Sequence, residues 1–328
     1  MDPELAAALP YLPQLPFSDL PTARATLDAL VEQLPPPDLT GVELEERTVP
    51  GPPDGPDVTV RVLRPRGGGT GRPAVLDIHG GGFAIGRADL GDSLNATIVR
   101  EVGAVVVSVD YRLAPEHPYP APAEDCYAAL AWLAGAASEL GVDPSRIAVL
   151  GDSAGGGLAA TTALLARDRG GPALAMQVLL EPELDDRLQT HSMVTGTDTP
   201  VWHYANAVKS WEFYLGGKAA DGYAAPARME DLSGLPPTFL TVNELDPLRD
   251  EGLEYARRLL VAGVSTELHC YAGAFHGFLL VATAAIARRA QANLHRALRS
   301  GLGVSVPATS AGSVGGDPAS AGAASTGL

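Results

Sequence analysis

The sequence predicts an α/β fold with a mostly parallel central sheet and helices on both of its faces. Short apolar runs, several of them rich in valine, recur from residue 74 onwards, and they are continuous rather than alternating. Segments with helical spacing separate most of these runs, an order typical of a parallel sheet that is buried on both sides. The six runs are 74–80, 104–111, 146–151, 176–182, 237–244 and 265–271.

The N-terminal part of the chain has a different character. Residues 22–34 place apolar side chains at helical spacing and end at three prolines, which predicts a helix outside the core. Residues 42–50 and 57–65 alternate in polarity and are separated by turn residues, which predicts an antiparallel strand pair. The sheet is therefore expected to begin with an antiparallel N-terminal pair.

One long insertion breaks the alternation of runs and helices. Residues 184–225 are too long for a simple crossover and are rich in aromatic residues, which favours packing over a solvent loop. We expect this insertion to join residues 1–40 in a helical cap above the carboxyl edge of the sheet, where open α/β sheets bind ligands. The core then comprises residues 41–183 and 226–300.

The last segment, residues 301–328, is nearly all small residues without an apolar period. It cannot bury enough surface to offset the entropy of ordering, so we expect a disordered tail.

Composition narrows the class of protein. With 23 basic and 39 acidic residues the formal net charge is −16, which disfavours nucleic acid and anionic membranes as partners because their fields would repel the chain. The N-terminus lacks a secretion signal, and no apolar run approaches the roughly 18 residues that span a bilayer. We therefore expect a cytoplasmic protein, with Cys126 and Cys270 as buried free thiols rather than a disulfide.

The stretch GDSAGG at residues 151–156 lies where a predicted strand meets a predicted helix. Its Gly-x-Ser-x-Gly pattern predicts a sharp, strained turn that lifts the Ser153 oxygen clear of the backbone. Small flanking residues are needed because a larger side chain would block that turn. Ser153 is therefore the candidate nucleophile.

A serine hydroxyl is a poor nucleophile near neutral pH, so it needs a base that is itself oriented by an acid. Among the seven histidines, His276 lies in a predicted loop between the last apolar run and the C-terminal helix. His269 and His295 lie inside predicted regular elements instead. The sequence therefore favours His276 as the base.

Three acidic residues follow the run at 237–244 and are candidates for the orienting acid, namely Glu244, Asp246 and Asp250. Asp250 lies within the first turns of a predicted helix, where the helix dipole explains an acidic residue. Asp246 precedes Pro247 in the loop and is the preferred candidate.

The reaction also needs donors for the oxygen that becomes an anion in a tetrahedral intermediate. The sequence HGGGF at residues 79–83 follows a predicted strand, and its three glycines let backbone amides approach a substrate closely. This loop is therefore the candidate oxyanion hole.

Five motifs occur in an order that resembles the hormone-sensitive-lipase-like esterases of the α/β-hydrolase superfamily, in the branch with GDSAG. The resemblance covers roughly residues 40–298. It implies an α/β-hydrolase fold and a serine carboxylesterase that acts on short to medium acyl esters through an acyl-enzyme. The motifs are HGGGF (79–83), DYRLAPEHPYPAPAED (110–125), GDSAGG (151–156), DPLRDEG (246–252) and FHGF (275–278).

The resemblance also implies roles for individual residues. Ser153 is the nucleophile, Asp246 the acid and His276 the base. The amides of Gly81, Gly82 and Ala154 are the oxyanion donors, His79 orients the glycine loop, and Tyr111, Arg112, Glu116 and Asp125 form a structural tie beside the serine.

Contacts with substrate are expected from three aromatic residues, Phe83, Trp202 and Trp211. The stretch EPELDD at residues 181–186 departs from the family, since many relatives have a tyrosine before the proline, and Ala272 stands where a proline is frequent. The first departure bears on the shape of the acyl pocket, because the loop after this strand helps to form it.

The expected partner is a small-molecule ester, with neither nucleic acid nor membrane insertion, and a homodimer through the cap is compatible with this function. No cofactor and no metal are implied, because His79 and His117 lack partners at metal-ligand spacing. Two alternatives stay open from the sequence. An amidase or peptidase uses the same three residues. A non-catalytic ligand-binding protein on this fold typically lacks one of the three, whereas this sequence has them all.

Overall fold

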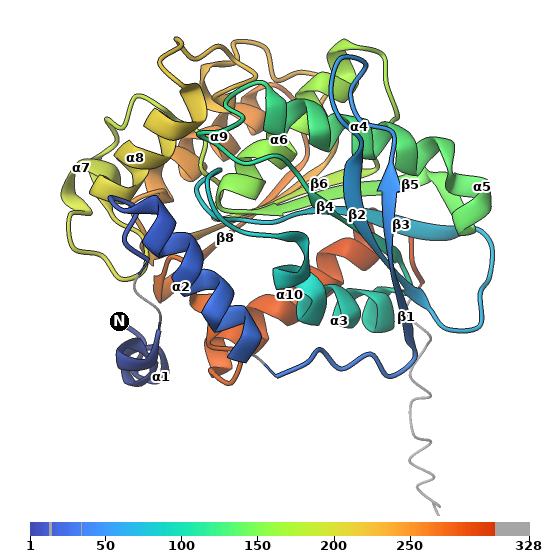
Figure 1. The fold of residues 1–328 in the computed structure, drawn as a ribbon, viewed down its shortest axis with the longest axis horizontal. Coiled ribbons are helices and arrows are strands. Elements are labelled where there is room, and N and C mark those ends of the chain that lie inside the picture. The colour runs from blue at the N-terminus through green and yellow to red at the C-terminus, as the bar shows by residue number, and fades with distance from the viewer. Residues whose placement is uncertain (13–14, 34, 306–328) are drawn as a thin grey trace, which may run out of the picture.

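The computed structural model describes residues 1–12, 15–33 and 35–305. The strands are β1 (Val42–Val49), β2 (Val58–Pro65), β3 (Arg72–Ile78), β4 (Val105–Asp110), β5 (Val142–Asp152), β6 (Met176–Leu180), β7 (Thr238–Leu245) and β8 (Thr266–Phe275). Within the described residues they form one sheet of eight strands in the order β1-β2-β4-β3-β5-β6-β7-β8. β2 is antiparallel to β1 and β4, whereas the pairs from β4 to β8 are parallel. The predicted mostly parallel sheet with an antiparallel N-terminal pair is therefore confirmed (Figure 1).

The helices alternate with the strands along most of the chain. They are α1 (Pro3–Ala8), α2 (Leu20–Gln33), α3 (Asp92–Val102), α4 (Ala121–Gly135), α5 (Ala137–Leu140), α6 (Ala154–Asp168), α7 (His191–Thr195), α8 (Tyr204–Leu215), α9 (Arg249–Val261) and α10 (Ala285–Gly301). Short 3₁₀ helices are η1 (Leu9–Tyr11), η2 (Ala88–Gly91), η3 (Pro226–Arg228) and η4 (Phe278–Leu280).

Both faces of the sheet are covered by helices, as the continuous apolar runs predict. In β4 all residues from Val105 to Val109 are buried, because alternate side chains enter two different cores. One core packs against α4, α6 and α9, and the other packs against α3 and α10 (Figure 1). The carboxyl edge of the sheet stays available for loops that carry function.

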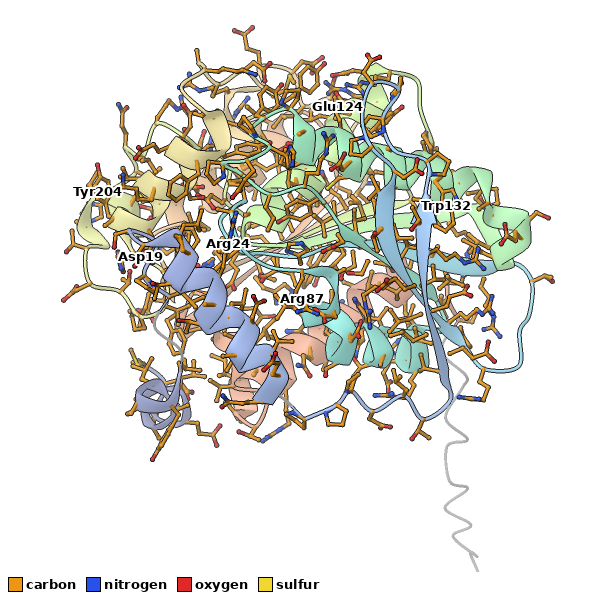
Figure 2. The ribbon with its side chains drawn as sticks, viewed as in Figure 1. Asp19, Arg24, Arg87, Glu124, Trp132 and Tyr204 are labelled. Carbon is orange, nitrogen blue, oxygen red and sulfur yellow. The ribbon has the colours of Figure 1, made fainter. Side chains whose placement is uncertain are left out.

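The N-terminal segment and the insertion meet each other in space. Leu20 and Leu27 of α2 belong to one apolar cluster with Met193 of α7 and Ala207 of α8. Arg24 fixes α2 to the core, because its guanidinium donates to the carboxylate of Glu116 at 2.6 and 2.8 Å and also donates to two backbone carbonyls. Figure 2 shows Arg24 pointing from α2 toward the body of the molecule.

Three further sequence expectations concern the chain ends and the cysteines. α10 ends at Gly301, residues 302–305 continue beyond it, and the rest of the predicted tail, 306–328, lies outside the described residues. Cys126 is buried, but Cys270 is exposed, so the expectation of burial is wrong for Cys270. The reason is that β8 is an edge strand with incomplete cover.

Across the described ranges, no helix combines the length and the apolar character that crossing a membrane requires.

Candidate active site

Three predicted side chains meet at the carboxyl edge of the sheet. Ser153 follows β5, Asp246 follows β7 and His276 follows β8, and parallel strands bring these ends to the same edge. His276 Nε2 lies 2.9 Å from Ser153 Oγ, and His276 Nδ1 lies 2.8 Å from Asp246 Oδ2. All three side chains are buried. The carboxyl edge of the sheet therefore holds a continuous hydrogen-bonded chain from the Ser153 hydroxyl through the His276 imidazole to the Asp246 carboxylate.

The backbone at Ser153 is strained in the way that the sequence pattern predicts. Its φ is +56° and its ψ is −120°, a conformation that non-glycine residues rarely adopt. A Cβ added at Gly151 would lie 2.0 Å from the carbonyl oxygen of Gly155, and one added at Gly155 would lie 2.0 Å from that of Ile78. Only glycine fits at these two positions, so the flanking glycines are what make the turn possible.

Asp246 and His276 hold each other in a fixed orientation. Asp246 Oδ1 accepts a hydrogen bond from the backbone N–H of Leu248 at 2.9 Å, which leaves Oδ2 for the imidazole. Burial by itself would lower the pKa of His276, but the neighbouring carboxylates of Asp246 and Glu181 outweigh burial and raise it. The ring is therefore set with Nδ1 toward Asp246 and Nε2 toward Ser153.

The glycine loop faces the same edge. Gly81 and Gly82 have φ values of +127° and +54°. Added Cβ atoms would lie 2.1 Å from the Ile85 carbonyl at Gly81 and 2.7 Å from the Phe17 ring at Gly82. Ala154 opens α6, so its N–H is one of the first donors of the helix and has no intrahelical acceptor.

His79 holds the glycine loop through contacts with Gly80 and Tyr111. Its Nδ1 lies 2.8 Å from the carbonyl oxygen of Gly80, and its ring stacks on Tyr111 with centroids 4.2 Å apart. Burial lowers the pKa of His79 and keeps the ring neutral. The Tyr111 hydroxyl donates to the carbonyl oxygen of His79 at 2.9 Å, while Arg112 and Asp125 form a bidentate ion pair.

The three aromatic residues expected to touch substrate fall in two places. The Trp202 ring lies 5.8 Å from the His276 ring and 5.0 Å from Phe17, measured between centroids. Phe83 stacks on Tyr214 at 4.0 Å and lies 5.5 Å from Trp211, within a buried aromatic cluster. Trp202 therefore lies beside His276, whereas Phe83 and Trp211 pack with Tyr214 in the buried core.

Sequence reasoning missed Phe17 and Glu181. Phe17 belongs to a segment without any motif, so no signal in the sequence singles it out. Glu181 accepts a hydrogen bond from the backbone N–H of Gly277 at 2.7 Å and a second, short one from Asn243 Nδ2. The signal for Glu181 is the departure from the family pattern before Pro182.

Among the described residues, one group of side chains has the proximity of a metal site. Potential ligand atoms of Glu181, Asp246 and His276 lie within 4.8 Å of one another. Two of these residues already bind each other, and Glu181 binds the backbone next to His276. Hydrogen bonding explains the cluster, and the chemistry available to it is proton transfer to and from Ser153.

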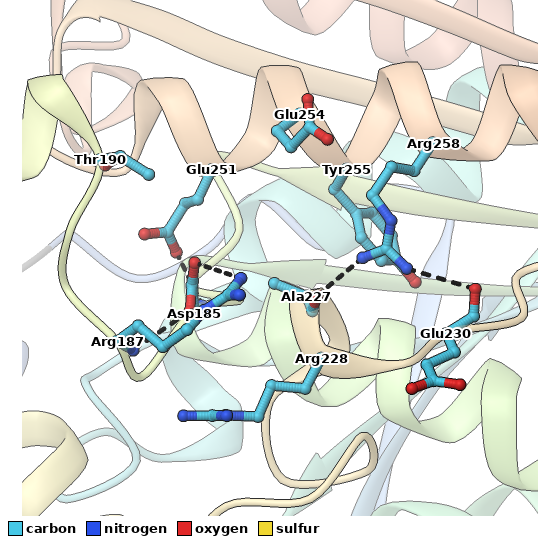
Figure 3. Close-up of a pocket in the computed structure, with 10 residues that line it drawn as sticks. All are labelled: Asp185, Arg187, Thr190, Ala227, Arg228, Glu230, Glu251, Glu254, Tyr255 and Arg258. Atoms are coloured by element: carbon cyan, nitrogen blue, oxygen red, sulfur yellow. Dashed lines mark hydrogen bonds and ion pairs between the residues drawn. The ribbon is translucent and has the colours of Figure 1, made fainter.

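Two of the cavities in the described structure are lined by residues other than Ser153, Asp246 and His276. One, of about 360 Å³, is lined by residues of α9, of the segment after β6 and of the stretch 227–230 (Figure 3). Glu251 anchors the segment after β6 by accepting from the backbone N–H groups of Leu184 at 2.6 Å and Asp185 at 3.2 Å. The other, of about 600 Å³, lies between residues 15–18 and the start of α8. Phe17 lines the larger cavity and packs against Trp202, whose ring in turn lies 5.8 Å from that of His276.

The chain is similar to proteins of known activity over most of its length. The family model described as the alpha/beta hydrolase fold matches residues 75–280. A carboxylesterase of Mycobacterium tuberculosis, NlhH, is 44% identical over 287 residues, which cover 84% of this chain and 89% of that protein. The structure of a bacterial heroin esterase is 53% identical with a TM-score of 0.89, and covers 92% of this chain and 98% of its own.

A more distant relative agrees with these two. The esterase LipW from Mycobacterium marinum has a solved structure with a TM-score of 0.83, at 38% identity over 92% of this chain and 96% of that one. The resemblance drawn from the five motifs is therefore confirmed. The chain belongs to the α/β-hydrolase fold family, among its hormone-sensitive-lipase-like carboxylic ester hydrolases.

Proposed function

We propose that the protein hydrolyses small carboxylic esters with short to medium acyl chains through an acyl-enzyme, with Ser153, His276 and Asp246 as the reacting machinery. One observation carries the proposal, namely the hydrogen-bonded chain from Ser153 Oγ through the imidazole to Asp246. That chain supplies a nucleophile, a base and an orienting acid in the geometry that acyl transfer needs.

In the proposed reaction His276 Nε2 takes the proton of Ser153 Oγ as the oxygen attacks the ester carbonyl carbon. The same imidazole then returns the proton to the leaving alcohol, which leaves the acyl group on Ser153. A water molecule repeats the sequence and releases the carboxylic acid. Asp246 stabilises the imidazolium formed in each half-reaction, and the steps use only these side chains and water.

The amides of Gly81, Gly82 and Ala154 are proposed as the donors to the oxyanion. Their support is the bare glycine backbone at the site and the free first turn of α6. Loss of one such donor typically costs about 3 kcal/mol of transition-state stabilisation. The glycines cannot be replaced without moving Phe17 or the backbone at Ile85.

We also propose that residues 1–40 and 184–225 form the cap over a core of residues 41–183 and 226–300. The apolar cluster shared by α2, α7 and α8 supports this division. Trp202 would form one wall for the substrate, and Phe83 would form another where its ring edge approaches Gly157 on the first turn of α6. Trp211 would support Phe83 from behind.

A cytoplasmic location and a homodimer through the cap stay predictions. Light scattering after size-exclusion chromatography measures the oligomeric state directly. A measured mass equal to that of one chain at micromolar concentration would contradict the predicted homodimer.

Turnover of a series of p-nitrophenyl esters graded in acyl length tests the proposal, with a matched anilide as the amide substrate. The wild type should hydrolyse short and medium esters much faster than the anilide, and Ser153→Ala should lose at least about a thousandfold in kcat. Ser145→Ala, a substitution at an exposed serine, is the matched control and should retain wild-type rates. Unchanged ester turnover in Ser153→Ala would contradict the proposal.

A further inference from the structure

The residue two positions after Glu181 is also a glutamate, and it is fixed directly against the nucleophile turn. The backbone N–H of Glu183 donates to the carbonyl oxygen of Ser153 at 3.0 Å. The next N–H, of Leu184, donates to Glu251 at 2.6 Å. A Cβ added at Gly157 would lie 2.2 Å from the Glu183 carbonyl, so this backbone also touches the first turn of α6. The position of Glu183 is therefore rigid.

The Glu183 side chain is fully buried, yet it lacks the partners that a buried carboxyl normally has. Its exposed fraction is 0%, and neither of its oxygens has a hydrogen-bond partner among the described residues. The hydroxyl of Ser210 on α8 lies close enough to lower the pKa of Glu183, although the pair does not meet ordinary hydrogen-bond geometry, and Ser210 has no other partner among the described residues. A buried polar group left unpaired costs on the order of 1–3 kcal/mol, so the Glu183 carboxyl calls for an explanation.

Two other carboxyl groups near the reacting atoms already have partners, whereas Asp152 keeps one buried oxygen without a partner. Asp246 binds His276 and the N–H of Leu248, and Glu181 binds Asn243 and the N–H of Gly277. Of Asp152, Glu181, Glu183 and Asp246, Glu183 is the one with two buried oxygens that make no hydrogen bond of ordinary geometry within the described chain, and Ser210 is the hydroxyl beside them.

The charge around Ser153 is one-sided. In the part of the chain that the structure describes, no lysine or arginine forms an ion pair with Asp152, Glu181, Glu183 or Asp246, and the one ion pair in this set is that of Asp246 with His276. Burial raises the pKa of Glu183 to about 8, although Ser210 and His276 act in the opposite direction. The site therefore disfavours further negative charge and offers a carboxyl that ionises when a cation arrives.

We propose that Glu183 and Ser210 form a polar subsite beside Ser153 that binds a cationic nitrogen of the substrate. The enzyme then prefers esters with an ammonium group close to the scissile carbonyl over neutral esters of the same shape, and it rejects anionic ones. This inference rests on the proposed ester hydrolysis. It deepens that function by naming the charge class of the substrate.

The physical basis is the pairing of the Glu183 carboxylate with the substrate's ammonium group, because burying either charge alone costs free energy. An ionised Glu183 without a counter-charge would be strongly destabilised, and so would an ammonium group stripped of water. Together they form an ion pair, with Ser210 able to donate to the carboxylate. Because the backbone of Glu183 is fixed to Ser153, the pair also fixes the distance between the cation and the reacting carbonyl.

The test compares kcat/KM for two matched pairs of esters in the wild type, Glu183→Gln and Glu183→Leu. In each pair a trimethylammonium group in one ester is replaced by a tert-butyl group in the other, so charge is the only difference. Acetylcholine and its tert-butyl isostere carry the group on the alcohol side, and a second pair carries it on the acyl side. Glu230→Gln, which removes an exposed carboxylate, is the control.

In at least one pair the wild type should favour the cation, and both Glu183 variants should lose at least about tenfold of that cation-to-neutral ratio, or about 1.4 kcal/mol. The pair that responds shows on which side of the ester the cation binds. An equal ratio in wild type and both variants overturns the inference and leaves an ordered water molecule as the partner of Glu183. If the wild type hydrolyses no ester at all, the proposed function fails instead, so the two failures are distinct.

Discussion

Replacing Glu183 by glutamine should stabilise the folded protein, and increasingly so as the pH rises. The pKa of Glu183 is raised by burial from 4.5 to about 8 in the folded state. The unfolded chain therefore releases this proton at lower pH than the folded protein does. Between these two values the free energy of unfolding falls by about 1.4 kcal/mol per pH unit, and the total loss approaches roughly 5 kcal/mol above pH 8. Glutamine does not ionise and avoids this loss.

The assay is urea unfolding of wild type and Glu183→Gln at two pH values, about 5.5 and about 9. Linkage gives a wild-type loss of about 1.4 kcal/mol at the lower pH and nearly 5 at the higher, so the stability gap should widen by about 3 kcal/mol. Other buried carboxyls, such as Asp77 with its pKa raised by burial to about 6, titrate in both proteins and cancel in the difference. A gap that stays constant with pH would refute the reasoning, and Glu230→Gln should show no widening.

Four further predictions concern the proposed reacting groups and the proposed cap. Asp246→Asn should lower kcat at least about a thousandfold with little effect on KM, because the imidazole loses its orienting partner. Since His276 must be neutral to act as base and its pKa is raised, kcat/KM should fall as pH decreases, with a midpoint above 6.5 in a pH–rate profile. Glu181→Leu removes the acceptor of the Gly277 N–H and should lower kcat roughly tenfold or more, whereas Glu181→Gln should recover most of it in the same assay. Arg24→Met should loosen α2 and raise KM more than it lowers kcat, as measured by steady-state kinetics.

The fold was predictable because local patterns and global architecture agree in this chain. Valine-rich runs such as 104–111 have no polar face, so they fit only a strand with helices on both sides. The Ser153 turn was equally predictable, because its tight backbone requires glycine at residues 151 and 155, where the sequence has glycine. Asp246 and His276 were identifiable since both follow strands, and strand ends converge at one edge.

The rest of the site depends on contacts that carry no local signature. Phe17 reaches Gly82 and Trp202 from a proline-rich segment, and only tertiary packing selects it. Glu183 lies in a stretch whose unusual residues the sequence does show, but burial and the lack of partners are properties of the folded chain. Cys270 is exposed because β8 lies at the edge of the sheet. The order of the strands determines this position, and no local residue pattern predicts it.

Covalent labelling with a fluorophosphonate, read by mass spectrometry of the intact and digested protein, tests the central claim most directly. Wild type should take up one label, on Ser153, and His276→Ala should react far more slowly, because its serine loses the base 2.9 Å away. A wild-type protein that stays unlabelled, or that carries the label on a different serine, would contradict the assignment of this site.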